Sequence, residues 1–213
     1  MLENYNSMYN LYVKRGLDFI LAIVFLLLLW PIYLLIACAI VMDTGFPVFY
    51  RAERGGFRNA SFRIFKFRSM VQSADKIGGG TTALNDSRIT KVGNLLRKTK
   101  LDETAQIFNI ILGDMSFVGP RPELLKYTSR YAGDEQLIFN VRPGITDYSS
   151  LQFISLDEIV GDRNADQIYE EQVLGPKNLL RVKYAREVSF ETDCAIFLKT
   201  IFKTLKKMIK FFR

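Results

Sequence analysis

Two adjacent carboxylates, Asp102 and Glu103, stand among basic side chains and form the most reactive grouping in the sequence. Arg97, Lys98 and Lys100 precede them, and a helix is predicted to start beside them. The positive end of a helix and neighbouring cations both favour the ionised form of a carboxylate. An ionised Asp can attack phosphorus as a nucleophile, and a neighbouring Glu can hold a divalent metal ion through oxygen.

A purely structural interpretation of these carboxylates is also open. Thr99 and Asp102 have the spacing of a capping box, in which the carboxylate only accepts hydrogen bonds from backbone N–H groups at a helix start. Spacing alone favours this capping interpretation over a nucleophile.

Arginines beside prolines indicate where phosphate could bind. Arg121 lies between Pro120 and Pro122, and Arg142 precedes Pro143. Because proline fixes the backbone, each guanidinium is presented rigidly, and its fork of donors matches phosphate oxygens. A rigid turn that carries a surface arginine explains each motif equally well.

The net charge of +7 comes from two basic blocks on either side of an acidic middle. Residues 51–100 carry 12 basic and 3 acidic side chains, whereas residues 194–213 carry 6 basic and no acidic ones. Residues 101–193 carry 9 basic and 16 acidic side chains. No motif of a nucleic-acid-binding module is found, so nucleic acid is not an expected partner. Lys66 and Arg68, in the first block, suit phosphates and lipid headgroups better.

Histidine is absent from the 213 residues, which excludes Ser-His-Asp and Cys-His nucleophiles and His-ligated zinc. Acid–base chemistry must then come from carboxylates, Lys, Tyr or a bound metal ion. The two cysteines, Cys38 and Cys194, form neither a disulfide framework nor a CxxC motif. A reducing, cytosol-facing setting is therefore expected.

A run of 24 residues without charge, from Phe19 to Met42, predicts a membrane-embedded helix. Basic residues flank the run on both sides, and the positive-inside rule places both flanks in the cytoplasm. A helix that bends at Trp30-Pro31 and returns to the same face satisfies both flanks. A Pro-kinked helix that crosses the membrane once is the alternative, and the residues alone support the two equally.

The last part of the chain, residues 194–213, predicts a basic amphipathic helix. Apolar residues recur at helical spacing on one face, and lysines such as Lys199, Lys203 and Lys207 occupy the other. This pattern is typical of a helix that lies on anionic lipid headgroups. A core helix with a solvated lysine face is the alternative.

The middle of the chain predicts an α+β fold, because strand signals are few. A hairpin is predicted around Gly55-Gly56, with an extended segment at 141–146. Helices are predicted over residues 71–76, 89–100, 101–112, 122–139 and 164–186.

Short motifs in order along nearly the whole chain resemble the monotopic phosphoglycosyl transferases, the bacterial sugar transferase family that includes undecaprenyl-phosphate sugar phosphotransferases. Each motif alone is unspecific, whereas their order and spacing together are highly specific. The motifs are Lys14-Arg15-x-x-Asp18, Gly45-Phe46-Pro47-Val48-Phe49, Lys66-Phe67-Arg68-Ser69-Met70, Asp86-Ser87-Arg88-Ile89-Thr90, the segment from Arg97 to Glu103, the segment from Gly113 to Pro122, Val141-Arg142-Pro143-Gly144-Ile145-Thr146, and Asp193 with Thr200.

The resemblance implies a reaction and a place for it. A phosphosugar passes from a UDP-sugar to polyprenol phosphate at the cytoplasmic face of the bacterial inner membrane, and UMP is released as glycoconjugate assembly begins. Asp102 is implied to be the nucleophile that forms a covalent aspartyl phosphosugar, and Glu103 a Mg²⁺ ligand. Phosphate or nucleotide binding is implied for Lys66, Arg68, Arg97, Arg121, Arg142 and Asp193.

The resemblance also implies an architecture. It favours a re-entrant helix-break-helix, with the break at Pro31, in a membrane segment of residues 1–44. A small cytoplasmic α/β catalytic domain of residues 45–193 follows, and 194–213 is the amphipathic helix at the membrane surface.

Two segments depart from the family pattern, and neither change removes a catalytic group. The motif of the carboxylate pair begins Thr99-Lys100-Leu101, where Ser or Thr followed by Ser-Leu is usual. Many members carry Gly-Trp-Ala-Gln-Val after Pro-Gly-Ile-Thr, whereas Asp147-Tyr148-Ser149-Ser150-Leu151 stands here. The sugar is therefore not predicted. Two rival functions are a non-catalytic scaffold that binds anionic lipid at the membrane surface and a phospholipid-type hydrolase that releases sugar phosphate into water.

Overall fold

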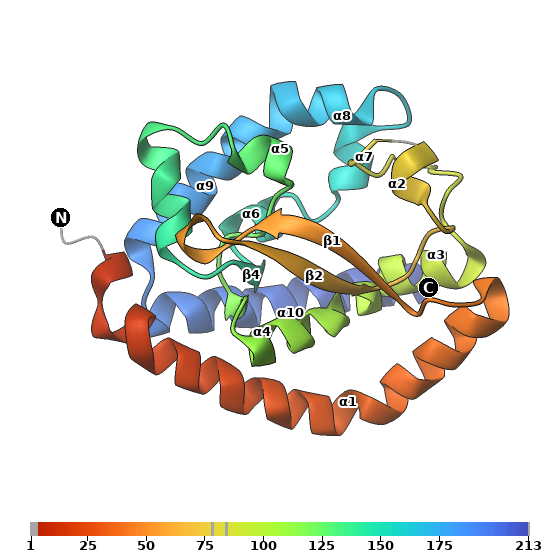
Figure 1. Cartoon of the computed structure of the whole chain (residues 1–213), viewed down its shortest axis with the longest axis horizontal. Coiled ribbons are helices and arrows are strands. Elements are labelled where there is room, and N and C mark those ends of the chain that lie inside the picture. Colours follow the sequence, from red (N-terminus) through yellow and green to blue (C-terminus); the bar gives the residue numbers. More distant parts are fainter. Residues whose placement is uncertain (1–3, 78, 84, 213) are drawn as a thin grey trace.

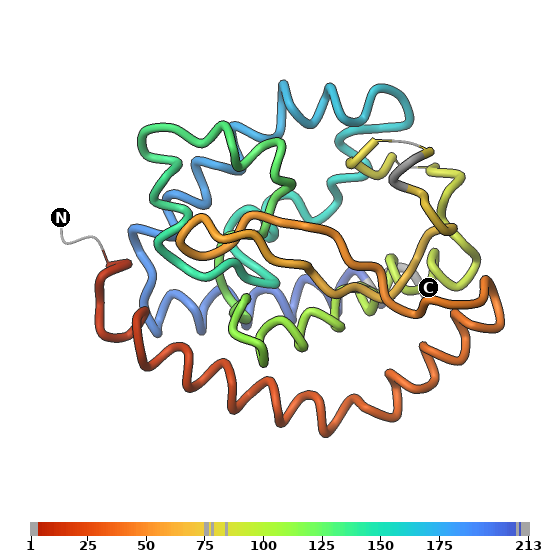
Figure 2. The backbone as a smooth tube through the Cα atoms, viewed as in Figure 1, coloured from red at the N-terminus to blue at the C-terminus, as the bar shows by residue number. Residues whose placement is uncertain are grey.

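The computed structural model describes residues 4–77, 79–83 and 85–212. A mixed body of helices and strands lies above one long helix, α1 (Lys14–Thr44), which follows the lower edge of the molecule in Figure 1. The backbone tube in Figure 2 shows both ends of α1 rising toward that body. Two small sheets accompany the helices, which confirms the predicted α+β class.

Helix α1 contains the uncharged run. Together with the turn before it, the helix from Tyr9 to Thr44 is long and apolar enough to cross a membrane. The helix continues through Pro31 and curves instead of breaking there (Figure 1). The expected helix-break-helix is thus one curved helix, because the loss of one N–H donor at a proline bends a helix whose neighbouring turns persist.

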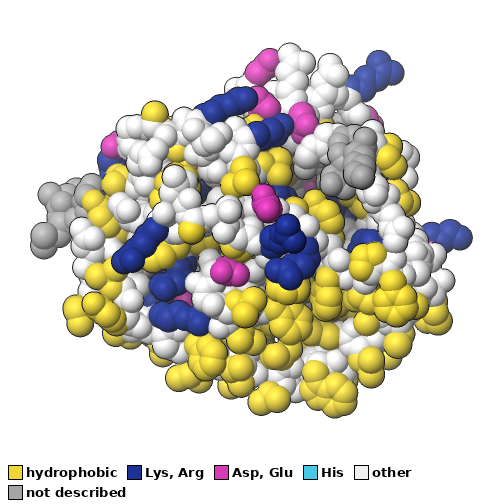
Figure 3. Space-filling view, viewed as in Figure 1, with side chains coloured by type: hydrophobic (Ala, Val, Ile, Leu, Met, Phe, Trp, Pro, Cys, Tyr) yellow, Lys and Arg dark blue, Asp and Glu magenta, His cyan; other side chains and the backbone are white. Residues whose placement is uncertain are grey.

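The outer face of α1 is apolar and exposed. Leu27, Leu28 and Leu35 are 67–70% exposed, whereas Ala22 and Ile40 on the inner face are buried. Figure 3 shows hydrophobic side chains gathered along this edge of the molecule, with Lys and Arg above them. A continuous apolar band on the surface of a charged protein indicates a membrane-facing surface.

The two sheets of the body are short and have two strands each. Strands β1 (Phe49–Gly55) and β2 (Ser61–Phe67) pair antiparallel along their full length, which confirms the predicted hairpin. Strands β3 (Ser116–Val118) and β4 (Gly144–Thr146) pair in parallel. The extended segment expected at 141–146 is therefore a strand only at its end.

Most helices of the body are short. Their bounds are α2 Ala74–Ile77, α3 Lys91–Thr99, α4 Ile107–Leu112, α5 Leu125–Thr128, α6 Tyr148–Gln152, α7 Leu156–Val160, α8 Ala165–Ile168, α9 Leu174–Glu187 and α10 Phe190–Phe212, with 3₁₀ turns at Asn4–Asn6, Phe57–Asn59, Leu101–Gln106 and Gly133–Asn140, and π turns at Tyr9–Val13 and Tyr169–Val173.

The helix predicted over 164–186 is confirmed as the continuous run of α8, a π turn and α9, and α3 confirms the helix near 89–100. The single helix predicted over 122–139 is wrong: α5 ends at Thr128, and a 3₁₀ turn begins at Gly133. Between them the chain turns so that the ring of Tyr131 packs against that of Phe139 in the core, with ring centroids 5.5 Å apart and the planes tilted. Tertiary packing of these aromatic rings overrides the helical pattern.

The main core joins α1 to the hairpin and to α4. Tyr33 packs at 5.2 Å, ring to ring, on Phe67 of β2, and its hydroxyl donates to the Thr104 carbonyl at 2.9 Å. Ile64, Phe67 and Ile110 are almost fully buried in the same cluster. The second half of α1 therefore holds the turn that carries Asp102 and Glu103, which starts only two residues after α3 ends.

Helix α10 runs along the body, and its lysines do not all face outward. Lys203 Nζ donates to the Leu151 carbonyl at 3.0 Å, and Lys207 Nζ donates to the Ile154 carbonyl at 3.3 Å. The exposed side chains of α10 include Lys199, Lys203 and Lys206 and also a set of apolar ones, namely Leu198, Ile201, Phe202, Leu205 and Ile209. Part of the lysine face predicted to meet lipid is thus bound to the protein; the side chains at 208 and 210–213 lie outside the described part.

Candidate active site

The turn that carries the two carboxylates does not form the capping box. Lys100 adopts the left-handed conformation with φ 60° and makes no side-chain cap. The Thr99 hydroxyl donates back to the Leu95 carbonyl at 2.8 Å, inside its own helix. Asp102 is 4% exposed, and its Oδ1 is buried without a hydrogen-bond partner among the described residues. The capping interpretation is therefore wrong, and the Asp102 carboxylate is left available for chemistry.

Glu103 is held by two cations from two other elements. Lys66 Nζ, on β2, lies 3.3 Å from Glu103 Oε1, and Arg121 Nη2 donates to the same oxygen. Arg121 Nη1 also donates to the Ile145 carbonyl at 3.1 Å, which fixes the plane of its guanidinium. The structure thus brings together three of the residues predicted for the site, next to Asp102.

The pKa values of the two carboxyls are driven apart. Burial, and then the charge of Glu103, raise the pKa of Asp102, while Lys66 and Arg97 oppose the rise. Burial would also raise the pKa of Glu103, but Arg121 and Lys66 outweigh it and hold that pKa well below its ordinary value. Such separation marks pairs in which one carboxylate stays ionised and the other is the more basic and reactive.

Two of the predicted phosphate-binding arginines are engaged elsewhere. Buried Arg68 donates to Thr44 Oγ1 at 2.5 Å and to the Gly45 carbonyl at 2.6 Å, so it holds the end of α1. Arg142 Nε donates to the Gly113 carbonyl at 3.2 Å, at the end of α4. These contacts favour a structural role for Arg68, whereas phosphate binding by Arg142 stays a prediction.

Asp193 joins α10 to the start of α1. Its carboxylate binds Lys14 and accepts hydrogen bonds from Tyr9 at 2.7 Å and Tyr184 at 2.6 Å. The Asp193 oxygens are thus committed to groups other than the site around Asp102. Nucleotide binding by Asp193 stays a prediction that these contacts do not favour.

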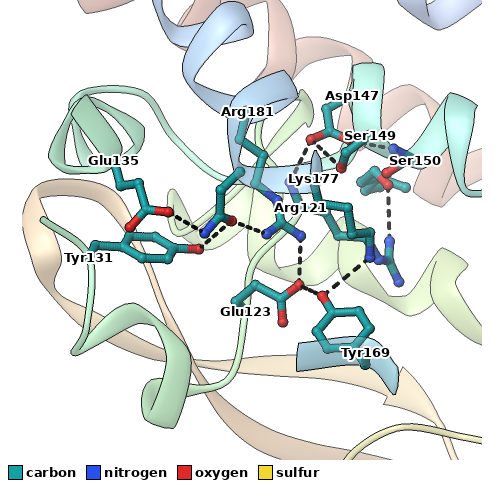
Figure 4. A network of polar contacts seen from close by, with 12 residues as sticks. Arg121, Glu123, Tyr131, Glu135, Asp147, Ser149, Ser150, Tyr169, Lys177 and Arg181 are labelled. Carbon is teal, nitrogen blue, oxygen red and sulfur yellow. Dashed lines mark hydrogen bonds and ion pairs between the residues drawn. The ribbon is translucent and has the colours of Figure 1, made fainter. Parts of the chain in front are cut away.

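A second charged network, not predicted from the sequence, centres on Glu123, two residues after Arg121. Figure 4 shows Glu123 with Arg181 and Tyr169 directed at its carboxylate, and Lys177 beside them. Fully buried Arg181 donates to Glu123 at 2.6 Å, and the Tyr169 hydroxyl donates to the same oxygen. Its partners come from a helix more than 40 residues away, so no local motif could have found this network.

Comparison with known proteins decides the family. A family model described as bacterial sugar transferase matches residues 9–207. The chain belongs to the bacterial sugar transferase family.

The names of individual family members specify different sugars. A UDP-glucose:undecaprenyl-phosphate glucose-1-phosphate transferase of Escherichia coli (strain K12) is 36% identical over 201 residues, which cover 91% of this chain and 40% of the relative. A UDP-N-acetylgalactosamine-undecaprenyl-phosphate N-acetylgalactosaminephosphotransferase of Aeromonas hydrophila is 37% identical over 145 residues, 66% of this chain and 34% of the relative.

A UDP-galactose-lipid carrier transferase of Erwinia amylovora is 33% identical over 211 residues, 92% of this chain and 41% of the relative. The chain spans less than half the length of these three relatives. Their names specify three different sugars.

Magnesium binding by Glu103 stays a prediction. The described residues hold no group of three or more His, Cys, Asp or Glu. Mg²⁺ is usually bound by one or two carboxylates together with waters and substrate phosphates, so a larger cluster is not needed. Glu103, whose Oε1 is bound by Lys66 and Arg121, is the carboxylate predicted to contribute to such a site, whereas Asp102 is the predicted nucleophile.

Glu123→Gln is expected to lower the free energy of unfolding at pH 7 by about 3 kcal/mol. Burial alone would raise the pKa of Glu123, but Arg181 and Lys177 outweigh it and lower the pKa to about 2. A carboxyl whose pKa is lowered on folding stabilises the fold above its ordinary pKa of 4.5, and this contribution is lost as the pH falls toward 2.

Urea unfolding in detergent micelles at pH 7 and pH 3 measures this effect. The stability of the variant should change less between these two values than that of the wild type. Asp134→Asn breaks an exposed ion pair with Arg186 and should cost less than about 1 kcal/mol. Equal costs for both variants would contradict the role given to the buried pair.

Proposed function

We propose that this chain transfers a sugar phosphate from a UDP-sugar to polyprenol phosphate and releases UMP, as the first membrane step of glycoconjugate assembly. The observation that carries the proposal is the buried Asp102 carboxylate, free of a cap, beside a Glu103 held by Lys66 and Arg121. The names of the relatives, which are transferases for undecaprenyl phosphate or a lipid carrier, support the two substrates.

The reaction consists of two displacements at one phosphorus atom. The Asp102 carboxylate attacks the phosphorus that bears the sugar, the P–O bond to UMP breaks, and the electron pair leaves with the UMP phosphate. A phosphate oxygen of the polyprenol phosphate then attacks the same phosphorus, and the bond to Asp102 breaks to restore the carboxylate. No proton has to be supplied, which suits a chain without histidine.

Positive charge around the carboxylates lowers the barrier to both displacements. Lys66 and Arg121 lie at Glu103, and the charge of Arg97 reaches Asp102. Preorganised cations stabilise the charge that builds on the equatorial phosphoryl oxygens. Glu103, together with substrate phosphates, would hold Mg²⁺, which supplies further positive charge for these oxygens.

The membrane arrangement in this proposal is re-entrant, at the cytoplasmic face of the inner membrane. Both ends of α1 are bound to the same body: Lys14 to Asp193 at the start, and Thr44 to Arg68 at the end. A helix that crossed the bilayer once would place these ends on opposite sides. The exposed apolar row of α10 would dip into the same leaflet, so a polyprenol acceptor can arrive laterally while the nucleotide sugar arrives from water.

Cysteine labelling tests this topology. Asn6→Cys and Ala60→Cys, each in a background with Cys38→Ala and Cys194→Ser, place one thiol on either side of the apolar helix in the sequence. A membrane-impermeant maleimide is expected to label both in inside-out vesicles and neither in intact spheroplasts. Labelling of the two positions from opposite sides would establish a single crossing.

Release of UMP tests the proposed function. The purified chain in detergent is incubated with a panel of UDP-sugars, with and without polyprenol phosphate and Mg²⁺. Catalytic UMP release that requires one of the UDP-sugars, Mg²⁺ and the lipid is expected. Free sugar phosphate in water would indicate a hydrolase, and no turnover with any UDP-sugar would indicate a non-catalytic lipid-binding scaffold.

A further inference from the structure

Asp147 lies at a junction between the candidate active site and the membrane-surface helix. It is fully buried and directly follows β4. Its Oδ2 accepts the backbone N–H of Arg121 at 3.2 Å, and its Oδ1 accepts the backbone N–H of Ser150 at 2.6 Å. Figure 4 shows Asp147 with Ser149, whose hydroxyl donates to both carboxylate oxygens. One side chain thus caps α6 and holds the backbone of a residue predicted to bind phosphate.

Further contacts, besides the one with Asp147, restrain the backbone around Arg121. Gly119 donates to the Thr146 carbonyl at 2.9 Å, and Gly144 donates to the Pro120 carbonyl at 3.1 Å. A Cβ added at Gly144 would lie 2.1 Å from the Gly119 nitrogen, so only glycine allows this approach. The close contact between Gly119 and Gly144 aligns the loop before Arg121 with β4. Asp147, which follows β4, accepts the backbone N–H of Arg121 itself.

Helix α10 holds residues 146–155, the segment that contains Asp147. The hydroxyls of Thr146 and Thr200 lie 2.7 Å apart, and Lys203 and Lys207 donate to the carbonyls of Leu151 and Ile154. The segment 146–155 is therefore fixed to α10 along its length. A rigid support of this kind keeps a site residue in its productive orientation.

We infer that Asp147 is a positioning residue for the transfer reaction: it holds the Arg121 backbone so that the guanidinium lies on Glu103. The inference rests on the proposed function. Asp147 opens the segment in which this chain departs from the Gly-Trp-Ala-Gln-Val pattern, and a glycine there would offer Arg121 no acceptor.

Asp147→Asn separates the two roles of the side chain, which are to cap α6 and to hold the Arg121 backbone. Its amide oxygen can still accept the Ser150 N–H, whereas its amide nitrogen would face the Arg121 N–H, donor against donor. The kcat for UMP release is expected to fall about 30-fold to 100-fold, since a displacement of about 1 Å at a site residue has effects of this size. The KM for the UDP-sugar should change less than threefold. Glu158→Gln, an exposed acid-to-amide change on α7, should leave both constants unchanged.

A double-mutant cycle distinguishes positioning from general structural damage. If Asp147 acts through Arg121, the double variant with Asp147→Asn and Arg121→Ala should be no slower than Arg121→Ala alone. Multiplied losses in the double variant, or wild-type kcat in Asp147→Asn, would overturn the inference. If Asp147→Asn is unfolded at the assay temperature, Asp147→Ser is measured instead, because serine also caps a helix but is too short to hold Arg121.

The outcome for Asp147 is separable from that for the proposed function. Absence of UMP release by the wild type refutes the proposed function itself. Release by the wild type together with an unaffected Asp147→Asn variant refutes only the inference.

Discussion

Asp102→Asn is expected to lower UMP release at least about a thousandfold, because it removes the nucleophile while keeping the shape of the side chain. The wild-type chain, incubated with its UDP-sugar but without polyprenol phosphate, should gain the mass of one sugar phosphate on the peptide that contains Asp102. The variant should gain none. Intact-protein and peptide mass spectrometry, with release of UMP in the first turnover, measure both results.

The stability of Asp102→Asn is its internal control. Burial, and then the charge of Glu103, raise the pKa of Asp102, so at pH values above its ordinary pKa of 3.8 its ionisation costs free energy of folding. An uncharged side chain of equal size removes this cost. The variant should therefore unfold at the same temperature as the wild type or at a higher one. A loss of activity could then not be attributed to unfolding. Wild-type turnover by Asp102→Asn would refute the covalent mechanism.

Arg121→Lys is expected to lower kcat/KM for the UDP-sugar about 100-fold, although the positive charge is kept. The guanidinium binds Glu103 with one nitrogen and the Ile145 carbonyl with the other. A lysine ammonium has a single nitrogen and cannot hold both groups in one plane. Glu103 would then lose its closer cation, and the positive charge beside the phosphoryl group would no longer be held in a fixed orientation.

Steady-state kinetics of UMP release at saturating polyprenol phosphate measure the Arg121→Lys effect. Arg130→Lys is the matched control, because Arg130 is an exposed arginine whose partner, Glu170, lies on the surface. It should stay within twofold of the wild type. Activity of Arg121→Lys within threefold of the wild type would show that charge alone suffices at this position.

Local patterns in the sequence predicted the elements that depend on neighbouring residues. The uncharged run 19–42 became α1, and the turn residues Gly55-Gly56 became the corner of a hairpin. Alternation, helical spacing and turn residues are properties of adjacent positions, so a single chain reveals them. The helix expected over 122–139 failed because Tyr131 and Phe139 pack on each other in the core, which no local pattern encodes.

The sequence by itself determined the long apolar helix, the α+β class and the kinds of chemistry that a chain without histidine could perform. Only the tertiary structure decided that Asp102 is free of a cap, that Lys66 and Arg121 both bind Glu103, and that Arg68 and Asp193 hold α1. The physical reason is distance along the chain: Lys66 and Glu103 are 37 residues apart, and Lys14 and Asp193 are 179 apart. Whether such side chains meet depends on packing of the whole body, because ion pairs form across elements that only the fold brings together.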